Sequence, residues 1–234
     1  MIHFILFMLL GMAAYQSPLD DPFLIFLEQL ELDRADVYMD GVVMQEMSDD
    51  SVYIAAVIPV LVEKSDDYFV LDAYILLADR ESADIKAVFY EEKAWTSDAY
   101  FIRQIEIESE FYPVAPETKA FGVVLHYQSS SRVNRLDTRE LSLFVEDEGD
   151  LNRVLKDFYL MSSEIIIDGE CDSSTSSVSR SIEVTNQRTN NFFDLKVLEE
   201  TEQDIITQEN CTFQNVMKSR EEFTLTFRNG RYQP

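Results

Sequence analysis

The chain of 234 residues is 46% apolar, which is enough for an ordinary core in one large domain or two small ones and excludes disorder of its bulk. Its 44 Asp and Glu against 19 Lys and Arg give a formal net charge of −25, with the acids spread along the sequence. This charge opposes binding to nucleic acid or to an anionic membrane surface and permits a cationic protein partner. A solvated acidic surface without a specific partner is the commoner use of such a charge.

The first predicted element is an apolar run at the N-terminus. Residues 1–14, MIHFILFMLLGMAA, end in small residues and are shorter than the ~20 apolar residues that span a bilayer. They predict a signal peptide cleaved near Ala13 or Ala14. No Lys or Arg precedes the run, so a buried N-terminal element is the alternative. We therefore expect a periplasmic or secreted protein whose mature chain does not insert into a membrane.

Residues 15–50 are predicted to contain one short helix followed by a linker. In DDPFLIFLEQLEL, Asp20 or Asp21 can cap the helix and Pro22 suits its first turn. Four apolar residues fall on one helical face: Phe23, Phe26, Leu27 and Leu30. We expect this helix to cover an edge or an open end of a sheet.

From residue 51 to the C-terminus the hydrophobic period changes to two, which is typical of strands. In RQIEIESEF, for example, Ile105 and Ile107 alternate with Glu106 and Glu108. Many such segments, joined by turn-like pieces such as EKSDD, EDEGD and RNGRY, predict one all-β domain over 51–234. We expect antiparallel meanders arranged as a propeller-like stack of small sheets or as a β-sandwich, with a sub-boundary near 165–178. The segment DLNRVLKDFYL, residues 150–160, fits a helix or a strand equally well.

Several segments resemble a group of uncharacterised exported bacterial proteins. They are AAVIPVLVEKSDDYFVLDAYILLAD, AWTSDAY, AFGVVLHYQSSSRVN, ELSLFVEDEGDLNRVLKDF and DGEC, and they cover most of the chain between about residues 50 and 172. The closing segments FFDLKVLEE and FTLTFRNGRYQP are similar in rhythm to the last strands of FG-GAP-like secreted modules, without the Asp-rich calcium loop of true FG-GAP repeats. The resemblance implies an exported, β-rich bacterial protein and supplies no activity or catalytic residue.

Cys171 and Cys211 are the two cysteines of the chain. In an exported protein they have one possible pairing and predict a disulfide, which would stabilise the fold by up to ~4 kcal/mol on the chain-entropy model. Two cysteines alone make a poor zinc site, because structural zinc takes four ligands. We therefore interpret the segment between 165 and 184 as a turn stapled by Cys171.

One acidic loop has part of a calcium pattern. Asp168, Glu170 and Asp172 stand at positions 1, 3 and 5 of a short loop, where oxygen ligands for calcium are common. Ser173 then replaces the expected glycine, and Ser179 stands where an acid is needed. Calcium is thus a weak hypothesis against a solvated turn, and no other cofactor is predicted.

The segment FYEEKAWTSDAYF, residues 89–101, concentrates aromatic side chains beside acids. Trp95, Tyr100 and Tyr90 could line a platform for a sugar or a peptide, although such sets more often pack in a core.

Few residues suggest an enzyme. His126 is the only histidine after the predicted leader, and the chain contains no G-x-S-x-G, H-E-x-x-H or glycine-rich phosphate loop. With 44 acids, a carboxylate pair acting on a glycan can arise, but the sequence does not locate it. The leading hypothesis is an exported, non-catalytic β-rich binding or structural module of the bacterial envelope. The alternatives are an acid-residue hydrolase acting on a glycan and an inhibitor or receptor for a cationic protein.

Overall fold

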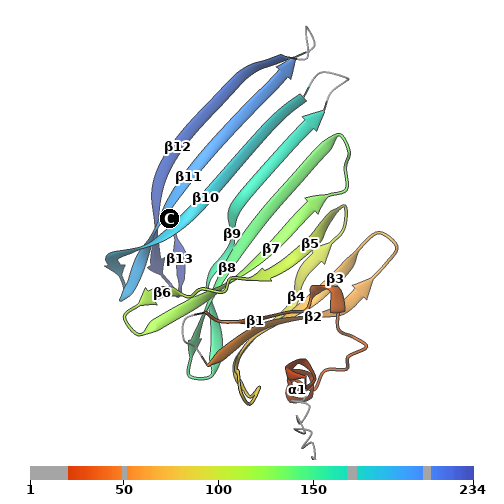
Figure 1. Ribbon diagram of the computed structural model, residues 1–234, viewed down its shortest axis with the longest axis vertical. Coiled ribbons are helices and arrows are strands. Elements are labelled where there is room, and N and C mark those ends of the chain that lie inside the picture. The colour runs from red at the N-terminus through yellow and green to blue at the C-terminus, as the bar shows by residue number, and fades with distance from the viewer. Residues whose placement is uncertain (1–20, 49–51, 168–172, 208–211) are drawn as a thin grey trace, which may run out of the picture.

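The computed structural model describes residues 21–48, 52–167, 173–207 and 212–234, with the backbone alone for 205–207 and 212–216. Within these residues the chain is mostly β with one short N-terminal α-helix, which confirms the predicted class (Figure 1). The helices are α1 (Pro22–Gln29) and the 3₁₀ turn η1 (Met39–Gly41). The strands are β1 (Val43–Glu46), β2 (Tyr53–Lys64), β3 (Phe69–Asp79), β4 (Ile85–Ser97), β5 (Tyr100–Ile107), β6 (Tyr112–Ala115), β7 (Thr118–Ser129), β8 (Asn134–Asp147), β9 (Asp150–Ile167), β10 (Ser173–Thr189), β11 (Phe192–Thr207), β12 (Thr212–Arg228) and β13 (Arg231–Gln233).

Helix α1 begins where the sequence predicts. The Asp21 carboxylate accepts a hydrogen bond from the Phe23 N–H at 3.1 Å, and Pro22 opens the first turn, where its missing N–H is not needed. The buried side chains of α1 pack against Ile58 of β2 and Leu76 of β3. The helix therefore covers a face of the sheet, not the edge or open end that we expected, because β2 and β3 present apolar residues on both faces.

Tight two-residue turns join three pairs of strands. Both central residues have positive φ in Glu148–Gly149, Asn190–Asn191 and Asn229–Gly230. This is the backbone of a type I′ turn, whose twist matches that of the antiparallel strands on either side. The first of these turns brings residues 150–160 back along β8, and tertiary pairing makes this ambiguous segment the first part of strand β9.

The strands form one large, open, mostly antiparallel sheet. Its main path runs β1-β2-β3-β4-β9-β10-β11-β12-β13, while β8 pairs with β9 and continues through β7 to β5 and β6. Strands β4 and β9 meet in parallel at a single bridge, Val88 opposite Asp150. Neither of the two predicted arrangements, a propeller-like stack or a sandwich, is shown by the described residues.

Apolar side chains form three buried clusters on the two faces of this sheet. One cluster is shared by β1–β5 with β7 and β8, a second by β6–β9 with β11–β13, and the third lies under α1. Strand β7 contributes to two of them, because Phe121 and Val123 belong to the first cluster while Ala120 and Val124 belong to the second. A strand buried on both faces has no polar side and reads as a continuous apolar run, as AFGVVL does.

Strands β9 to β12 extend beyond these clusters. Figure 1 shows them side by side up to one end of the long axis, with α1 near the other end. Strands β9 and β10 pair only between 161–167 and 173–179, and most side chains of this extension are half-buried or exposed. In the described part of the chain, no helix has the length and hydropathy needed to cross a membrane.

Candidate functional site

Five polar side chains from four strands gather on the sheet beside the first apolar cluster, against which one of them, Tyr127, packs. They are Tyr100 of β5, Tyr127 of β7, Glu140 of β8, and Asp157 and Tyr159 of β9, and we call them the tyrosine–carboxylate site. The rings of Tyr100 and Tyr127 stack with centroids 5.1 Å apart, and Glu140 lies opposite Tyr159 in the pairing of β8 with β9. Burial, followed by the charges of Glu140 and Asp157, raises the pKa of Tyr127; the charge of Glu140, followed by burial and the charge of Asp157, raises the pKa of Tyr159.

Glu140 is the least compensated charge of this site. Burial, followed by the nearby charge of Asp157, raises the pKa of its carboxyl group, and a hydrogen bond from the Thr138 hydroxyl at 3.3 Å opposes the rise. Thr138 is buried and is also hydrogen-bonded to the Tyr100 hydroxyl. Among the described residues, no cation forms an ion pair with Glu140. Its negative charge is therefore held in place by neutral groups alone.

A β-bulge positions Asp157. Residues of β9 outnumber those of β8 here, since Leu155 lies opposite Leu143 and Phe158 lies opposite Leu141. Asp157 has a φ of 46°, a left-handed backbone that Asp tolerates better than most residues. The Ser142 hydroxyl accepts a hydrogen bond from the Asp157 N–H at 3.2 Å and lies 3.3 Å from its carboxylate, as its donor. The bulge thus turns two consecutive side chains, Lys156 and Asp157, toward the same side of the strand.

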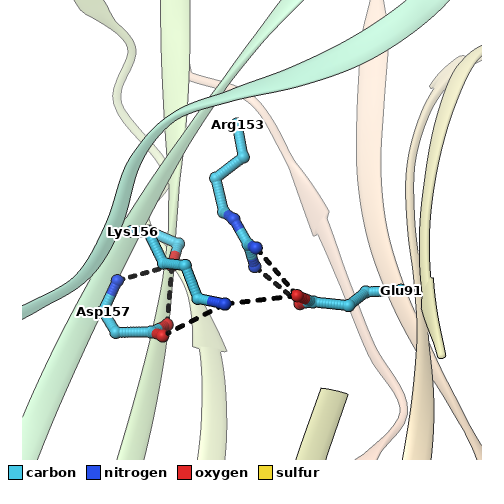
Figure 2. Close-up of polar contacts among 5 residues, drawn as sticks. Glu91, Arg153, Lys156 and Asp157 are labelled. Atoms are coloured by element: carbon cyan, nitrogen blue, oxygen red, sulfur yellow. Dashed lines mark hydrogen bonds and ion pairs between the residues drawn. The ribbon is translucent and has the colours of Figure 1, made fainter. Parts of the chain in front are cut away.

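An ion-pair group beside the site joins β9 to β4 (Figure 2). Arg153 donates two hydrogen bonds to Glu91, at 2.6 and 2.9 Å, and Lys156 donates a third at 3.3 Å. The hydrogen bond from Arg153 is the largest of the effects that lower the pKa of Glu91. Lys156 lies 3.8 Å from Asp157, farther than from Glu91. Both cations are therefore directed mainly at Glu91.

Two tyrosines of the site present hydroxyls without a hydrogen-bond partner within the described residues, Tyr127 and Tyr159. Tyr127 is partly buried against the first apolar cluster, whereas Tyr159 is 46% exposed. A ring with an apolar body and a free polar tip suits contact with a ligand. The site consequently offers aromatic surface, hydrogen-bonding groups and negative charge together.

A second acidic pair lies on the opposite face of β5 and β7. The Glu108 carboxyl accepts a hydrogen bond from the Tyr112 hydroxyl at 2.7 Å, and burial raises the pKa of Glu108. It lies directly over Gly122, where any Cβ would meet it and Leu141. A depression of ≈ 470 Å³, lined in part by Glu108, Phe111 and Tyr112, opens beside it.

Glu106 and His126 lie next to this carboxyl group. Glu106 accepts a hydrogen bond from Arg139 at 3.4 Å, and its carboxylate is 3.0 Å from Nε2 of His126. The same Nε2 is 3.3 Å from Nε of Arg139, which is a donor. One ring nitrogen cannot donate to Glu106 and accept from Arg139 at once, so only one of these two contacts is a hydrogen bond at any time. His126 therefore lies between two charged side chains that it helps to hold in place. No hydroxyl or thiol nucleophile is hydrogen-bonded to it in the described residues.

The three aromatic residues of the predicted platform have separate surroundings. Trp95 is 8% exposed and belongs to the first apolar cluster, so its ring faces the core. Tyr90 is exposed and donates a hydrogen bond of 2.6 Å to the buried Asp72. Only Tyr100 belongs to the tyrosine–carboxylate site, where its stacking partner is Tyr127.

The predicted disulfide and calcium loop fall outside the described residues, because positions 168–172 and 208–211 are not among them; this applies to Cys171, Cys211, Asp168, Glu170 and Asp172. The predicted leader, residues 1–14, lies outside them as well. The described residues contain no group of three or more His, Cys, Asp or Glu side chains arranged to hold a metal ion.

Sequence reasoning did not find Tyr127, Glu140, Asp157 or Tyr159. Strand pairing brings these residues together from distant parts of the sequence, and no motif with a fixed spacing links them. The one local signal is KDFY, residues 156–159, where a charged pair interrupts an apolar pattern. Neither family models nor curated proteins nor solved structures give a match to this chain.

Proposed function

We propose that this protein is an exported, non-catalytic binding module of the bacterial envelope and that it binds its ligand through the tyrosine–carboxylate site. One observation carries the proposal: three tyrosines and two carboxylates from four neighbouring strands form a single coupled group. Among the described residues, the hydroxyls of Tyr127 and Tyr159 have no hydrogen-bond partner, and the Glu140 carboxylate has a hydrogen bond from Thr138 but no ion-pair partner. The exported location is supported by the leader-like residues 1–14 and by the resemblance to exported bacterial proteins.

The arrangement of the site favours binding over chemistry. Tyrosines give large contact areas at a small cost in side-chain entropy, and their hydroxyls fix the orientation of a ligand. The five side chains project from paired strands of one sheet, and such a scaffold holds a binding surface more firmly than loops do. Thr138 and Ser142, whose hydroxyls donate to the two carboxylates of the site, are both buried, which does not suit an attacking nucleophile.

Binding by exposed tyrosine can be tested with matched variants. Tyr159→Ala removes a 46% exposed ring from the site, whereas Tyr68→Ala removes a 42% exposed ring from the turn between β2 and β3. The purified protein would be screened by calorimetry against neutral glycans, basic peptides and acidic peptides. We expect at least one class to bind, and Tyr159→Ala to weaken that binding by about tenfold or more while Tyr68→Ala leaves it unchanged. Equal affinities for the two variants would refute this assignment of the surface.

A second candidate function is hydrolysis of a glycan by Glu108 and Glu106. The specific observation is that Glu108 lines a depression with Phe111 and Tyr112 in its wall, and that the charge of Glu106 is close enough to act on Glu108. Burial raises the pKa of Glu108, as a proton donor requires, while Arg139 pairs with Glu106.

The two candidates predict different results with a panel of glycans. An enzyme gives turnover that Glu108→Gln and Glu106→Gln abolish, and that a change of an exposed acid in the turn between β3 and β4, Glu81→Gln, leaves intact. A binding module gives no turnover on any of them. Turnover that survives both Glu108→Gln and Glu106→Gln would exclude this pair.

A further inference from the structure

We infer that the tyrosine–carboxylate site binds a positively charged side chain of a basic protein, either a lysine ammonium or an arginine guanidinium. The inference rests on the proposed function, because it names the partner of the same surface. It follows from the charges at the site, from the aromatic groups around them and from the charge of the whole chain.

The first step is the balance of charges. The site holds two carboxylates that repel each other, Glu140 and Asp157, and the ion-pair group beside it adds Glu91 with two cations, Arg153 and Lys156. Both cations contact Glu91, and Lys156 reaches Asp157 only at 3.8 Å. Glu140 forms no ion pair among the described residues. One negative charge is therefore left without a cation.

The second step is the energetic meaning of that charge. A carboxylate taken partly out of water is unfavourable unless an opposite charge or several hydrogen bonds replace the lost hydration. Within the described parts of the chain, Glu140 accepts one hydrogen bond, from Thr138, and it is repelled by Asp157. A cation entering between the two carboxylates would change this repulsion into attraction to both. The site is thus more favourable with a bound cation than without one.

The third step concerns the aromatic groups. Tyrosine faces attract ammonium and guanidinium groups through their ring quadrupoles. The methylene stems of lysine and arginine also bury well against aromatic rings while their charged ends stay polar. Tyr100, Tyr127 and Tyr159 all lie close enough to Glu140 to be affected by its charge. The hydroxyls of Tyr127 and Tyr159, which have no hydrogen-bond partner among the described residues, can accept hydrogen bonds from N–H donors.

The fourth step is the field of the whole molecule. A formal net charge of −25 attracts a basic protein from a distance and raises its rate of encounter. A neutral glycan gains nothing from that field or from the unpaired charge of Glu140. A free monovalent amine would be attracted too, but a protein with many basic groups gains more from a surface charged in this way.

The test uses defined probes with the whole protein. Nα-acetyl-lysine methylamide and Nα-acetyl-arginine methylamide carry the two cations, and the norleucine and citrulline analogues are their neutral counterparts. A short oligolysine peptide stands for a basic protein, and neutral chitin and cellulose oligomers stand for glycans. Calorimetry at low and high salt would measure affinities for the wild type, for Glu140→Gln in the site and for Glu183→Gln on β10, an exposed acid that matches the loss of charge.

We expect the cationic probes to bind and their neutral analogues to fail. Glu140→Gln should weaken oligolysine by about ten- to hundredfold, the range for loss of a hydrogen bond to a charged group, and Glu183→Gln by less than about twofold. Affinity should fall as salt rises. Equal effects of the two variants, or no binding of any cationic probe, would overturn the inference.

The outcomes also separate this inference from the proposed function. If a neutral glycan binds, Tyr159→Ala abolishes its binding and no cation binds, the proposed function stands and the inference is wrong. If Tyr159→Ala changes the binding of no ligand class, both are wrong.

Discussion

The ion-pair group of Glu91 allows the sharpest prediction of stability. Arg153 and Glu91 are 16% and 26% exposed at their side chains and form two short hydrogen bonds. Exposed pairs contribute about 0.2–1 kcal/mol, and breaking a fully buried pair costs about 3–5 kcal/mol. For this partly buried bidentate pair, we expect Glu91→Gln to lower the free energy of unfolding by about 2 kcal/mol near neutral pH.

The group also matters because of its position. Backbone pairing between β4 and β9 is limited to one bridge, Val88 opposite Asp150. The side chains of Glu91 and Arg153 therefore supply much of the specific contact between these strands, together with the Arg153 guanidinium over the Phe89 ring, 5.0 Å from its centroid. Loss of the pair should loosen this junction more than loss of a pair within one hairpin.

The pH dependence gives the prediction a sign. The folded-state pKa of Glu91 is lowered, so its stabilising contribution is fully present above the unfolded value of about 4.3 and is lost as pH falls through the folded value. The difference in stability between wild type and Glu91→Gln should accordingly be constant from pH 7 to about 5 and shrink below that.

Urea unfolding followed by circular dichroism at several pH values measures this difference. The control is Glu46→Gln, which breaks an exposed pair with Arg80 at 3.4 Å and should cost under about 1 kcal/mol. A difference for Glu91→Gln that grows as pH falls, or that equals the difference for Glu46→Gln throughout, would refute the reasoning.

Three further predictions concern single positions. Gly122→Ala should destabilise the protein by about 1–3 kcal/mol, because the added Cβ meets the Glu108 carboxyl, and Glu108→Ala in the same chain should recover part of the loss in thermal unfolding. Gly149→Ala should lower the free energy of unfolding by about 1 kcal/mol in the same assay, because φ is +95° there. The added Cβ meets no side chain, so truncating a neighbouring side chain should not restore the lost stability. The hydrogen bond that Tyr90 donates to Asp72 raises the pKa of Tyr90 to about 12; Asp72→Asn should lower it, seen as phenolate absorbance at lower pH, and an unchanged titration would contradict the assignment.

Local sequence features predicted local structure well. The capping Asp21 and the proline after it place the start of α1, and EDEGD and RNGRY supply the residues that positive-φ turns require. Two-residue periodicity predicts the β class because side-chain alternation is a property of each strand alone. The residues 150–160 were ambiguous, since a bulge at Asp157 breaks the alternation that would have identified a strand.

The candidate site was only partly within reach of the sequence. The sequence pointed to Tyr100 because aromatic residues cluster around it in the chain. Trp95, from the same segment, is buried in the first apolar cluster and does not belong to the site. Nothing short of the pairing of β5, β7, β8 and β9 brings Tyr127, Glu140 and Tyr159 together. The number of residues between these side chains depends on the lengths of the hairpins. Ligand binding at the site does not fix those lengths, so no characteristic spacing appears in the sequence.

The sequence by itself thus determined the composition of the surface, the β class, the N-terminal helix and the tight turns, because each depends on charge totals or on contacts within a few residues. Tertiary structure alone decided that the strands form one open sheet, that α1 covers its face, and that Glu140 lies near three tyrosines with no cation paired to it among the residues that the structure describes. The physical reason is that strand order and bulges depend on which apolar faces can be buried together, and this is a property of the whole chain.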